Sequence, residues 1–329
     1  MKIKRVTAGV LAALLAMQIV VSGLSVPTYA KETDSEPGVE EPIEEPVEEP
    51  VQEEEPQQPV KPQKPKVTVS ADYAVLYNVE SGEMLFEKNA KKRTPTASTA
   101  KLMTAVAACH LFKENATFRV GKELNLVSWD ASRAGLKKGN RLSFSQIMSA
   151  LLLPSGCDAA YTIAVKGGRK LAGNAKLSPK KAVAHFEQYA NRLAKKLGLV
   201  NSHFVNPDGY DAKNQYSCAR DMAILAKEAL RQPRIYRVTK KASVKVKLLR
   251  GGWRNWTNTN AHLNKKSPYY IKECIGLKTG TTSKAGACLV SAVRKAGQVY
   301  VCVIMHTQKD KRFADSYRLL HYAMKYGIN

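Results

Sequence analysis

The stretch Thr94–Thr104 reads T-P-T-A-S-T-A-K-L-M-T and leads into a run of small and apolar residues. Pro95 and Ser98 are typical of helix starts, so a helix is predicted to begin here. Residues three apart share one helix face, which would place the Lys101 amine beside the Ser98 hydroxyl. A neutral lysine there could take the serine proton and activate the oxygen as a nucleophile. The alternative is a capped, buried helix with a solvated lysine, because this spacing also arises by chance.

The first 66 residues are predicted to lie outside any folded core. Residues 1–30 read as a secretory signal, with three basic residues among the first five positions, an apolar stretch and a cleavage end at Ala30. If this signal stays uncut, it would be an N-terminal anchor and the protein's one contact with a membrane. Residues 31–66 repeat E-E-P and read as a disordered, Glu/Pro-rich linker.

Residues 67–329 are predicted to form one large, strongly basic domain, with 45 Lys and Arg against 16 Asp and Glu. An exported basic domain favours an anionic environment such as a cell-wall polymer or the outer face of a membrane. Nucleic acid is not expected as a partner, because an exported chain without an aromatic-rich binding motif does not suit it.

The six cysteines mostly lie within apolar runs, which favours buried free thiols over disulfides: Cys109, Cys157, Cys218, Cys274, Cys288 and Cys302. No C-x-x-C pair or His/Cys cluster predicts zinc, so neither a metal nor a cofactor is expected.

Hydrophobic patterns predict a mixed α/β (α+β) fold. Short strands are expected at 74–77 and 84–86, at 244–249, and at 274–279, 287–293 and 299–306. Helices are expected at 143–153, 179–197, 219–230 and 313–326. Strands at both ends with helices between them predict one antiparallel sheet, flanked by helices, with a separate helical lobe.

Two further motifs carry polar groups suited to a substrate. Ser155-Gly156-Cys157 follows Pro154 in a predicted turn between two helices. Lys278-Thr279-Gly280 ends a predicted strand and is followed by Thr281. The missing side chain at Gly280 would let a substrate backbone lie against the strand. The lysine charge and the threonine hydroxyls would suit a carboxylate. Each motif alone is also what an ordinary turn or strand end would contain.

The order S-x-x-K, then S-G-C, then K-T-G resembles the serine-type D-alanyl-D-alanine carboxypeptidases, the low-molecular-mass penicillin-binding proteins of peptidase family S11. The resemblance covers residues 71–326 and includes H-F-V-N-P-D-G at 203–209 and N-T-N at 258–260. It implies a β-lactamase/transpeptidase-like fold with the active site between sheet and helical lobe. It also implies a peptidoglycan stem peptide ending in D-Ala-D-Ala as substrate, β-lactams as inhibitors, and a location outside the cytoplasm.

The resemblance assigns roles to matching positions. Ser98 would be the nucleophile, Lys101 the base, and Ser155 a proton relay to the leaving amine. The substrate carboxylate would be held by Lys278, Thr279 and Thr281, and the oxyanion by the backbone N–H groups of Ser98 and Thr281. Burial and the charge of Lys278 would lower the pKa of Lys101.

Cys157 departs from the family pattern, in which the second motif usually ends in asparagine. Cysteine is a weak donor and a weak acceptor, so this part of the substrate site is altered. A tolerated variant is the favoured interpretation. The alternatives are a β-lactamase, which needs a deacylating group that no glutamate in the sequence pattern supplies, and a non-catalytic wall-binding relative. His203, His262 and His306 are interpreted as structural.

Overall fold

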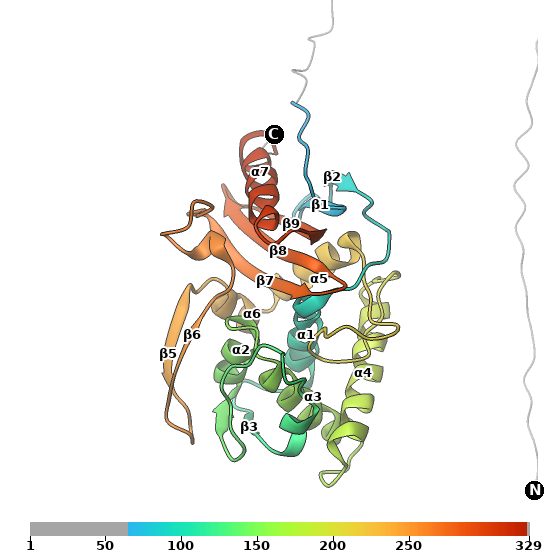
Figure 1. The fold of residues 1–329 in the computed structure, drawn as a ribbon, viewed down its shortest axis with the longest axis vertical. Helices are drawn as coiled ribbons and strands as arrows, with labels where there is room; N and C mark the ends of the chain where they lie inside the picture. Colours follow the sequence, from blue (N-terminus) through green and yellow to red (C-terminus); the bar gives the residue numbers. More distant parts are fainter. Residues whose placement is uncertain (1–64, 328–329) are drawn as a thin grey trace, which may run out of the picture. The chain divides into compact units, whose positions relative to one another are not determined.

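The computed structural model describes residues 65–327 (Figure 1), so the predicted signal and nearly all of the predicted linker lie outside the described residues. Its centre is a five-stranded antiparallel sheet in the order β2-β1-β9-β8-β7. The strands are β1 (Tyr73–Asn78), β2 (Met84–Lys88), β7 (Cys274–Thr282), β8 (Gly286–Lys295) and β9 (Gln298–Thr307). Both ends of the described chain therefore feed one sheet, as predicted.

The helices divide between the sheet and a lobe beside it (Figure 1). They are α1 (Lys101–Leu111), α2 (Phe144–Leu152), α3 (Cys157–Leu171), α4 (Pro179–Lys196), α5 (Ala219–Arg231), α6 (Pro233–Thr239) and α7 (Lys311–Tyr326). Helix α7 packs on one sheet face, whereas α5 packs on the other and joins it to the lobe formed by α1 to α4. Among residues 65–327, no helix has both the length and the apolar character that crossing a bilayer requires.

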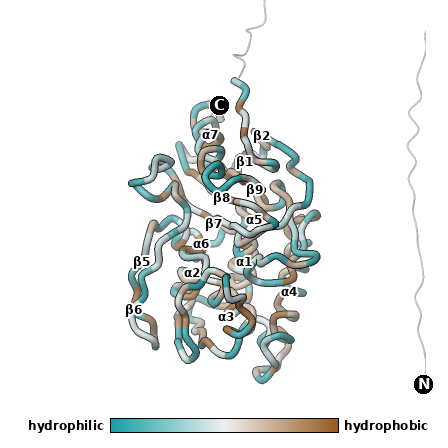
Figure 2. The backbone as a smooth tube through the Cα atoms, viewed as in Figure 1, coloured by the Kyte–Doolittle hydropathy of each residue, from teal (hydrophilic) through white to brown (hydrophobic). Residues whose placement is uncertain are grey.

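Alternation along the strands separates two apolar cores. In β9, Val301 and Val303 face the large core shared with α5 and the lobe, whereas Cys302 and Ile304 face the smaller core beneath α7. The strands are apolar on both faces because each face is covered by helices. Figure 2 accordingly shows apolar residues along the sheet and inside the lobe, with hydrophilic residues in the loops.

The structure also contains elements that the sequence patterns did not predict. These are α6, the ribbon of β3 (Thr117–Arg119) with β4 (Arg141–Ser143), and β6 (Trp253–Thr257). The expected edge strand at 244–249 is β5 (Ser243–Lys247), which pairs with β6 in a separate ribbon. Short 3₁₀ turns occur at η1 (Ala97–Ala100), η2 (Lys122–Leu126) and η3 (Ala261–Leu263). Three-residue strands and 3₁₀ turns of three to five residues are too short to show a periodic pattern, and α6 has only seven residues.

Candidate active site

Ser98 lies in the turn that leads into α1. The turn is a 3₁₀ segment, η1, and the α-helix itself begins at Lys101, slightly later than the sequence suggested. Ala97 has φ +45°, a left-handed conformation that is unfavourable for a residue with a side chain. Such strain is tolerated where the surroundings impose it, and it is frequent next to functional groups.

The Lys101 side chain is fully buried and has acceptors on three segments of the chain. Its Nζ lies 2.8 Å from Ser98 Oγ, 2.8 Å from the Asp208 carbonyl oxygen and 3.3 Å from Cys157 Sγ. The structure thus contains the Ser98–Lys101 contact that the helical spacing predicted. The Asp208 contact was not foreseen and comes from the segment that packs over η1.

Gly209 explains how that segment approaches so closely. A Cβ atom added at Gly209 would lie 1.8 Å from the Ala97 carbonyl oxygen, and its φ of +80° also favours glycine. The segment at 206–209 was noted in the sequence only through family resemblance. Its close approach lets the Asp208 carbonyl oxygen accept a hydrogen bond from the Lys101 amine.

Ser155 occupies the turn between α2 and α3, as the sequence predicted, and Cys157 is the first residue of α3. Ser155 has φ +64°, and its Oγ is buried without a hydrogen-bond partner among the described residues. Its carbonyl oxygen accepts a hydrogen bond of 2.6 Å from Ser132 Oγ. A strained serine with an unused hydroxyl is available to bind or relay a proton to a ligand.

Cys157 remains a neutral thiol in this environment. Burial raises the pKa of the Cys157 thiol, and the nearby Lys101 charge offsets this only in part. Its Sγ lies 3.7 Å from Ser132 Oγ. The thiol therefore fills the place beside Lys101 with weak polar contacts rather than with a negative charge.

The β7 edge forms the wall opposite Ser98. A Cβ atom added at Gly280 would lie 2.8 Å from the Ser98 backbone nitrogen and 2.8 Å from Ala97 Cβ. Thr279 Oγ1 is within 2.5 Å of Thr259 Oγ1. Gly280 therefore admits the turn that carries Ser98, and its predicted contact with a substrate backbone stays a prediction.

Lys278 is buried behind this edge, and its Nζ donates to the Thr279 carbonyl oxygen at 2.8 Å. Burial lowers the pKa of Lys278 well below its ordinary value, and the charge of Lys101 lowers it further. The Lys278 amine is enclosed by the protein, and no carboxylate lies within ion-pair distance of it among the described residues, which explains the direction of this shift.

Arg312, at the start of α7, is a member of the site that sequence reasoning missed. Its Nη1 donates to the Gly280 carbonyl oxygen at 3.0 Å and to Thr281 Oγ1 at 2.8 Å. It follows the K-T-G motif by some thirty residues without a motif of its own. The pairing of β7, β8 and β9 brings it back, which spacing alone does not reveal.

A cleft of about 430 Å³ lies between sheet and lobe, and its lining does not include Lys101, Ser155, Lys278, Thr279 or Gly280. Ser98, Cys157 and Thr281 line it directly. Tyr210 donates its hydroxyl to Asp130 at 3.1 Å across the opening. None of the three histidines considered above lines this cleft; His262, for example, is fully buried with Nδ1 2.7 Å from the Tyr269 carbonyl oxygen.

Known proteins share both the sequence and the fold. Residues 57–309 match the peptidase S11 family, described as D-alanyl-D-alanine carboxypeptidase. A D-alanyl-D-alanine carboxypeptidase of Streptomyces sp. strain K15 is 32% identical over 269 residues, covering 79% of this chain and 88% of that protein. The carboxypeptidase DacC of Escherichia coli strain K12 is 29% identical, and the match covers 79% of this chain and 62% of DacC. The crystal structure of the Streptomyces K15 DD-transpeptidase has a TM-score of 0.72 at 30% identity, covering 79% of this chain and 99% of that one.

A match of this extent defines a serine hydrolase with a β-lactamase-like fold, and it confirms the fold class expected from the sequence. The chain belongs to peptidase family S11, the D-alanyl-D-alanine carboxypeptidases. Proteins of this family act on peptidoglycan peptides that end in D-Ala-D-Ala, and they bind β-lactams.

Proposed function

We propose that this protein removes the terminal D-alanine from peptidoglycan stem peptides through an acyl-enzyme on Ser98. The observation that carries the proposal is the 2.8 Å contact between the buried Lys101 amine and Ser98 Oγ, opposite the β7 edge. A serine hydroxyl becomes a nucleophile when an adjacent base accepts its proton, and a neutral Lys101 is placed to do so.

The first half of the reaction forms the acyl-enzyme. Ser98 Oγ attacks the carbonyl carbon between the two D-alanines while its proton passes to Lys101. The backbone N–H groups of Ser98 and Thr281 stabilise the oxyanion. The proton then passes through the Ser155 hydroxyl to the leaving amine, and free D-alanine departs. The unpartnered Ser155 Oγ supports this relay.

Water completes the reaction by attacking the ester of Ser98. Lys101, neutral again after acylation, takes one proton from that water and returns it to the departing Ser98 oxygen. The described cleft lining holds Asp130, Asp208 and Asp211 but no glutamate. Two of these aspartates accept hydrogen bonds within the protein, Asp130 from Tyr210 and Asp211 from Thr282. These contacts support a peptidase whose β-lactam acyl-enzyme is long-lived, and rapid turnover of benzylpenicillin would favour the β-lactamase alternative instead.

The substrate carboxylate is proposed to bind beside Lys278, Thr279, Thr281 and Arg312. Its negative charge would favour the protonated form of Lys278, whose pKa burial otherwise lowers. Arg312 already reaches the Thr281 hydroxyl, so it can turn from that hydroxyl to the arriving carboxylate. The anionic substrate would thereby complete the charge balance of its own site.

We also propose that the protein acts outside the cytoplasm, in the cell wall or at the outer face of the membrane. Residues 1–30 would direct export, and residues 31–66 would separate the domain from the export site. Sequencing the N-terminus of the exported protein tests this. A start near residue 31 supports signal cleavage, whereas an intact N-terminus supports an anchor.

The enzymatic proposal is tested by measuring D-alanine release from a peptide ending in D-Ala-D-Ala. Wild type is expected to release D-alanine, and Ser98→Ala to lose this activity while keeping its thermal unfolding profile. The same peptide with an amidated C-terminus is expected to be a poor substrate, because it lacks the carboxylate. A folded wild-type protein that releases no D-alanine and forms no acyl-enzyme would support the non-catalytic alternative.

A further inference from the structure

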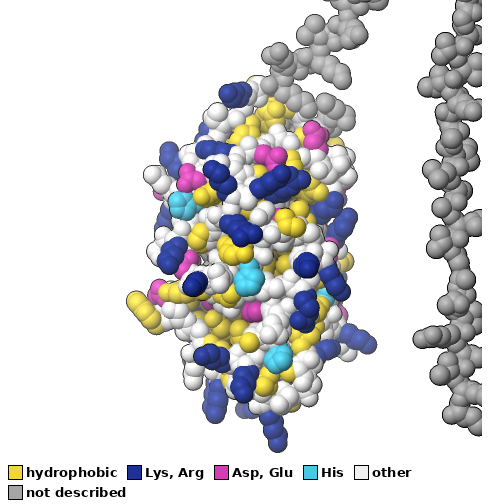
Figure 3. Space-filling view, turned by 90° about the vertical axis from the view of Figure 1, so that its right-hand side faces the viewer, with side chains coloured by type: hydrophobic (Ala, Val, Ile, Leu, Met, Phe, Trp, Pro, Cys, Tyr) yellow, Lys and Arg dark blue, Asp and Glu magenta, His cyan; other side chains and the backbone are white. Residues whose placement is uncertain are grey.

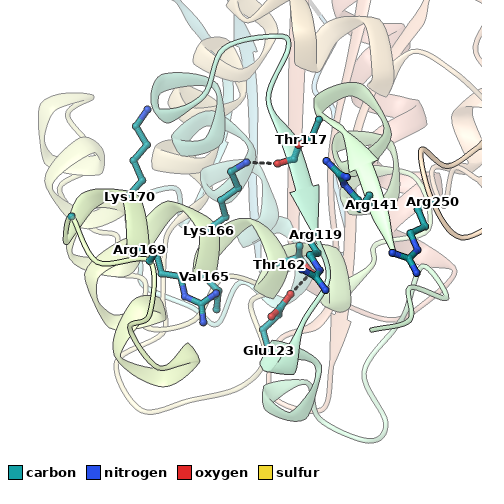
Figure 4. Close-up of a pocket in the computed structure, with 12 residues that line it drawn as sticks. Thr117, Arg119, Glu123, Arg141, Thr162, Val165, Lys166, Arg169, Lys170 and Arg250 are labelled. Atoms are coloured by element: carbon teal, nitrogen blue, oxygen red, sulfur yellow. Dashed lines mark hydrogen bonds between the residues drawn. The ribbon is translucent and has the colours of Figure 1, made fainter. Parts of the chain in front are cut away.

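A second cavity lies in the helical lobe (Figure 4), and it shares no lining residue with the Ser98 cleft. It has a volume of about 780 Å³ and lies between α3 and the β3–β4 ribbon. Its lining includes six cationic side chains: Arg119, Arg141, Lys166, Arg169, Lys170 and Arg250. Glu123 is the one acidic residue in this lining, so the cavity has an excess of five positive charges.

Three of the arginines lie side by side on neighbouring backbone segments. Arg119 and Arg141 are direct cross-strand partners in the β3–β4 ribbon. Arg141 and Arg250 exchange two backbone hydrogen bonds of 2.9 and 3.2 Å. Like charges placed directly opposite each other on paired strands are destabilising, so this row has an unfavourable energy without a counter-charge.

No such counter-charge is found within the described part of the chain. None of the three arginines has a carboxylate within 4.0 Å or a side-chain hydrogen bond there. All three side chains are exposed to the cavity and to solvent. The guanidinium donors of Arg119, Arg141 and Arg250 are therefore free to bind a ligand.

Glu123 does not neutralise the row, because its carboxylate has other partners. It accepts a hydrogen bond of 2.7 Å from the Gly121 backbone N–H and one of 3.2 Å from Thr162 Oγ1. Figure 4 shows the Thr162 contact at the base of the cavity. The Glu123 carboxylate thus contacts its own segment and α3, and it forms no ion pair with the three arginines.

The α3 wall adds cations at one-turn spacing. Lys166 is half-buried and donates to the Thr117 carbonyl oxygen, so its ammonium is fixed at the edge of the cavity. Arg169 uses its Nε on the Leu177 carbonyl oxygen at 2.9 Å, which leaves its two terminal nitrogens available. Lys170 is exposed one position further along. Two walls of cations therefore face one volume.

We propose that this cavity binds a phosphodiester polymer, with successive phosphate groups held along the row Arg119–Arg141–Arg250 and the α3 cations. Guanidinium groups bind phosphate through paired hydrogen bonds, and three in a row match a repeating anion better than a single one. A polymer also supplies several charges at once, which an excess of five cations requires. This step rests on the proposed location, because a strongly basic domain in the cell wall would meet anionic polymers there.

The binding site is separate from the peptidase cleft although one helix serves both. Helix α3 begins at Cys157 in the cleft, and Lys166 follows nine residues later. At 1.5 Å per residue this separates the two positions by about 14 Å along the helix axis. The polymer would therefore hold the enzyme on the wall without occupying the substrate site.

The test measures binding of a linear polyphosphate of defined length to the full-length protein at fixed, low salt. The pocket variant is Arg119→Gln/Arg250→Gln, and the control is Lys195→Gln/Lys196→Gln, which removes the same net charge from the exposed end of α4. The pocket variant is expected to bind at least about tenfold more weakly, since each charge-assisted hydrogen bond contributes roughly that factor. The control is expected to change by less than about twofold. Equal losses in both variants would overturn the proposal.

Thermal unfolding provides a second readout that a nonspecific charge effect would not reproduce. Without ligand, the pocket variant is expected to unfold at the same or a higher temperature than wild type, because repulsion within the row is relieved. With polyphosphate, wild type and the α4 control gain stability, and the pocket variant does not. An equal gain in the pocket variant would contradict the site.

Three further probes define the ligand. Inorganic phosphate is expected to bind far more weakly than the chain, and equal affinity would overturn the polymer. Polyglutamate of matched charge is expected to bind more weakly, and equal binding would overturn the phosphate class. Phosphatidylglycerol vesicles that bind through the arginine row more tightly than polyphosphate would place the ligand in a lipid surface instead. Acylation by penicillin should be unchanged in the pocket variant.

Discussion

Lys101 is enclosed on every side, and its amine meets the serine oxygen, a backbone carbonyl and a thiol. Because the Asp208 carbonyl and Ser98 contacts are both 2.8 Å, they hold the amine in place with or without the thiol. Figure 3 shows that many other basic side chains are spread over the surface, where their charges are solvated. Lys101 differs from these solvated residues by its burial beside Ser98, and the proposed mechanism depends on this difference.

We predict that Cys157→Ala changes the acylation rate only modestly, by less than about tenfold. The thiol is a weak acceptor for the Lys101 amine, and two oxygen acceptors at 2.8 Å remain when it is removed. The measurement is the rate of acylation by a chromogenic β-lactam. A collapse of that rate, in a variant whose thermal unfolding is unchanged, would show that the thiol takes part in the reaction.

Arg312→Gln is expected to lower kcat/KM for a D-Ala-D-Ala peptide by roughly 10- to 100-fold, mainly through KM. The reason is the loss of a charge-assisted hydrogen bond to the substrate carboxylate, which contributes about 1.5 to 3 kcal/mol. Lys325→Gln removes a charge from an exposed position of the same helix and is the matched control. If Arg312→Gln and the control behave alike, Arg312 does not touch the substrate.

The buried Glu187 on α4 gives a prediction about pH. Its Oε1 has no hydrogen-bond partner within residues 65–327. Burial, with a smaller contribution from the Asp208 charge, raises its pKa from 4.5 to about 8. Between those values the folded protein keeps a proton that the unfolded chain has lost, so stability falls as the pH rises through this window and stays reduced above it.

Glu187→Gln removes this loss, because an amide stays neutral. The free energy of unfolding of the variant minus that of wild type is expected to be larger at pH 9 than at pH 4, by on the order of a few kcal/mol. Urea unfolding at both pH values measures this. Glu83→Gln, at an exposed position, is the control and should show a flat difference. A flat difference for Glu187→Gln as well would mean that this carboxyl is ionised in the folded protein.

At the scale of elements, the site depends on the contact between η1 and the edge of β7. Gly280 allows that contact, because any side chain there would reach the Ser98 backbone nitrogen and Ala97. Gly280→Ala is therefore expected to push the strand away from the nucleophile and to slow acylation by at least about a hundredfold, since small displacements of reacting groups cost rates of that order.

Gly297→Ala, in the open turn between β8 and β9, is the matched control. It has φ +79° and free space around it, so alanine costs about 1 kcal/mol in backbone strain and leaves the cleft intact. Acylation kinetics and thermal unfolding of both variants are compared. If both lose the same stability and neither loses activity, the η1–β7 contact does not position Ser98.

The sequence predicted the long elements, because α4, α5, α7 and β7 to β9 each show a clear hydrophobic pattern. It placed Ser98 with Lys101 by helical spacing, and Ser155 with Cys157 by the turn after Pro154. It could not place Arg312 or the Asp208 carbonyl, because these reach the site through sheet pairing and through a close backbone contact at Gly209. The arginine row was likewise hidden, since Arg119, Arg141 and Arg250 lie far apart in sequence and meet only through three short strand segments.

At the scale of the whole molecule, the sheet and the lobe each supply part of the cleft. The sheet carries the cationic strand edge, and the lobe carries the two serines and the buried Lys101. Because α1 and α5 pack in one core with the sheet, these parts are held together by a continuous apolar interior rather than by the cleft residues. The second, basic cavity lies in the helical lobe and does not interrupt this shared core.

The most direct test of this account is mass spectrometry of the protein after reaction with benzylpenicillin, followed by peptide mapping. We predict an added mass of one intact penicillin, located on the peptide that contains Ser98, persisting long enough to be isolated, and absent from folded Ser98→Ala. An adduct on another residue, or no adduct on the folded wild-type protein, would contradict the assignment of Ser98 as the nucleophile.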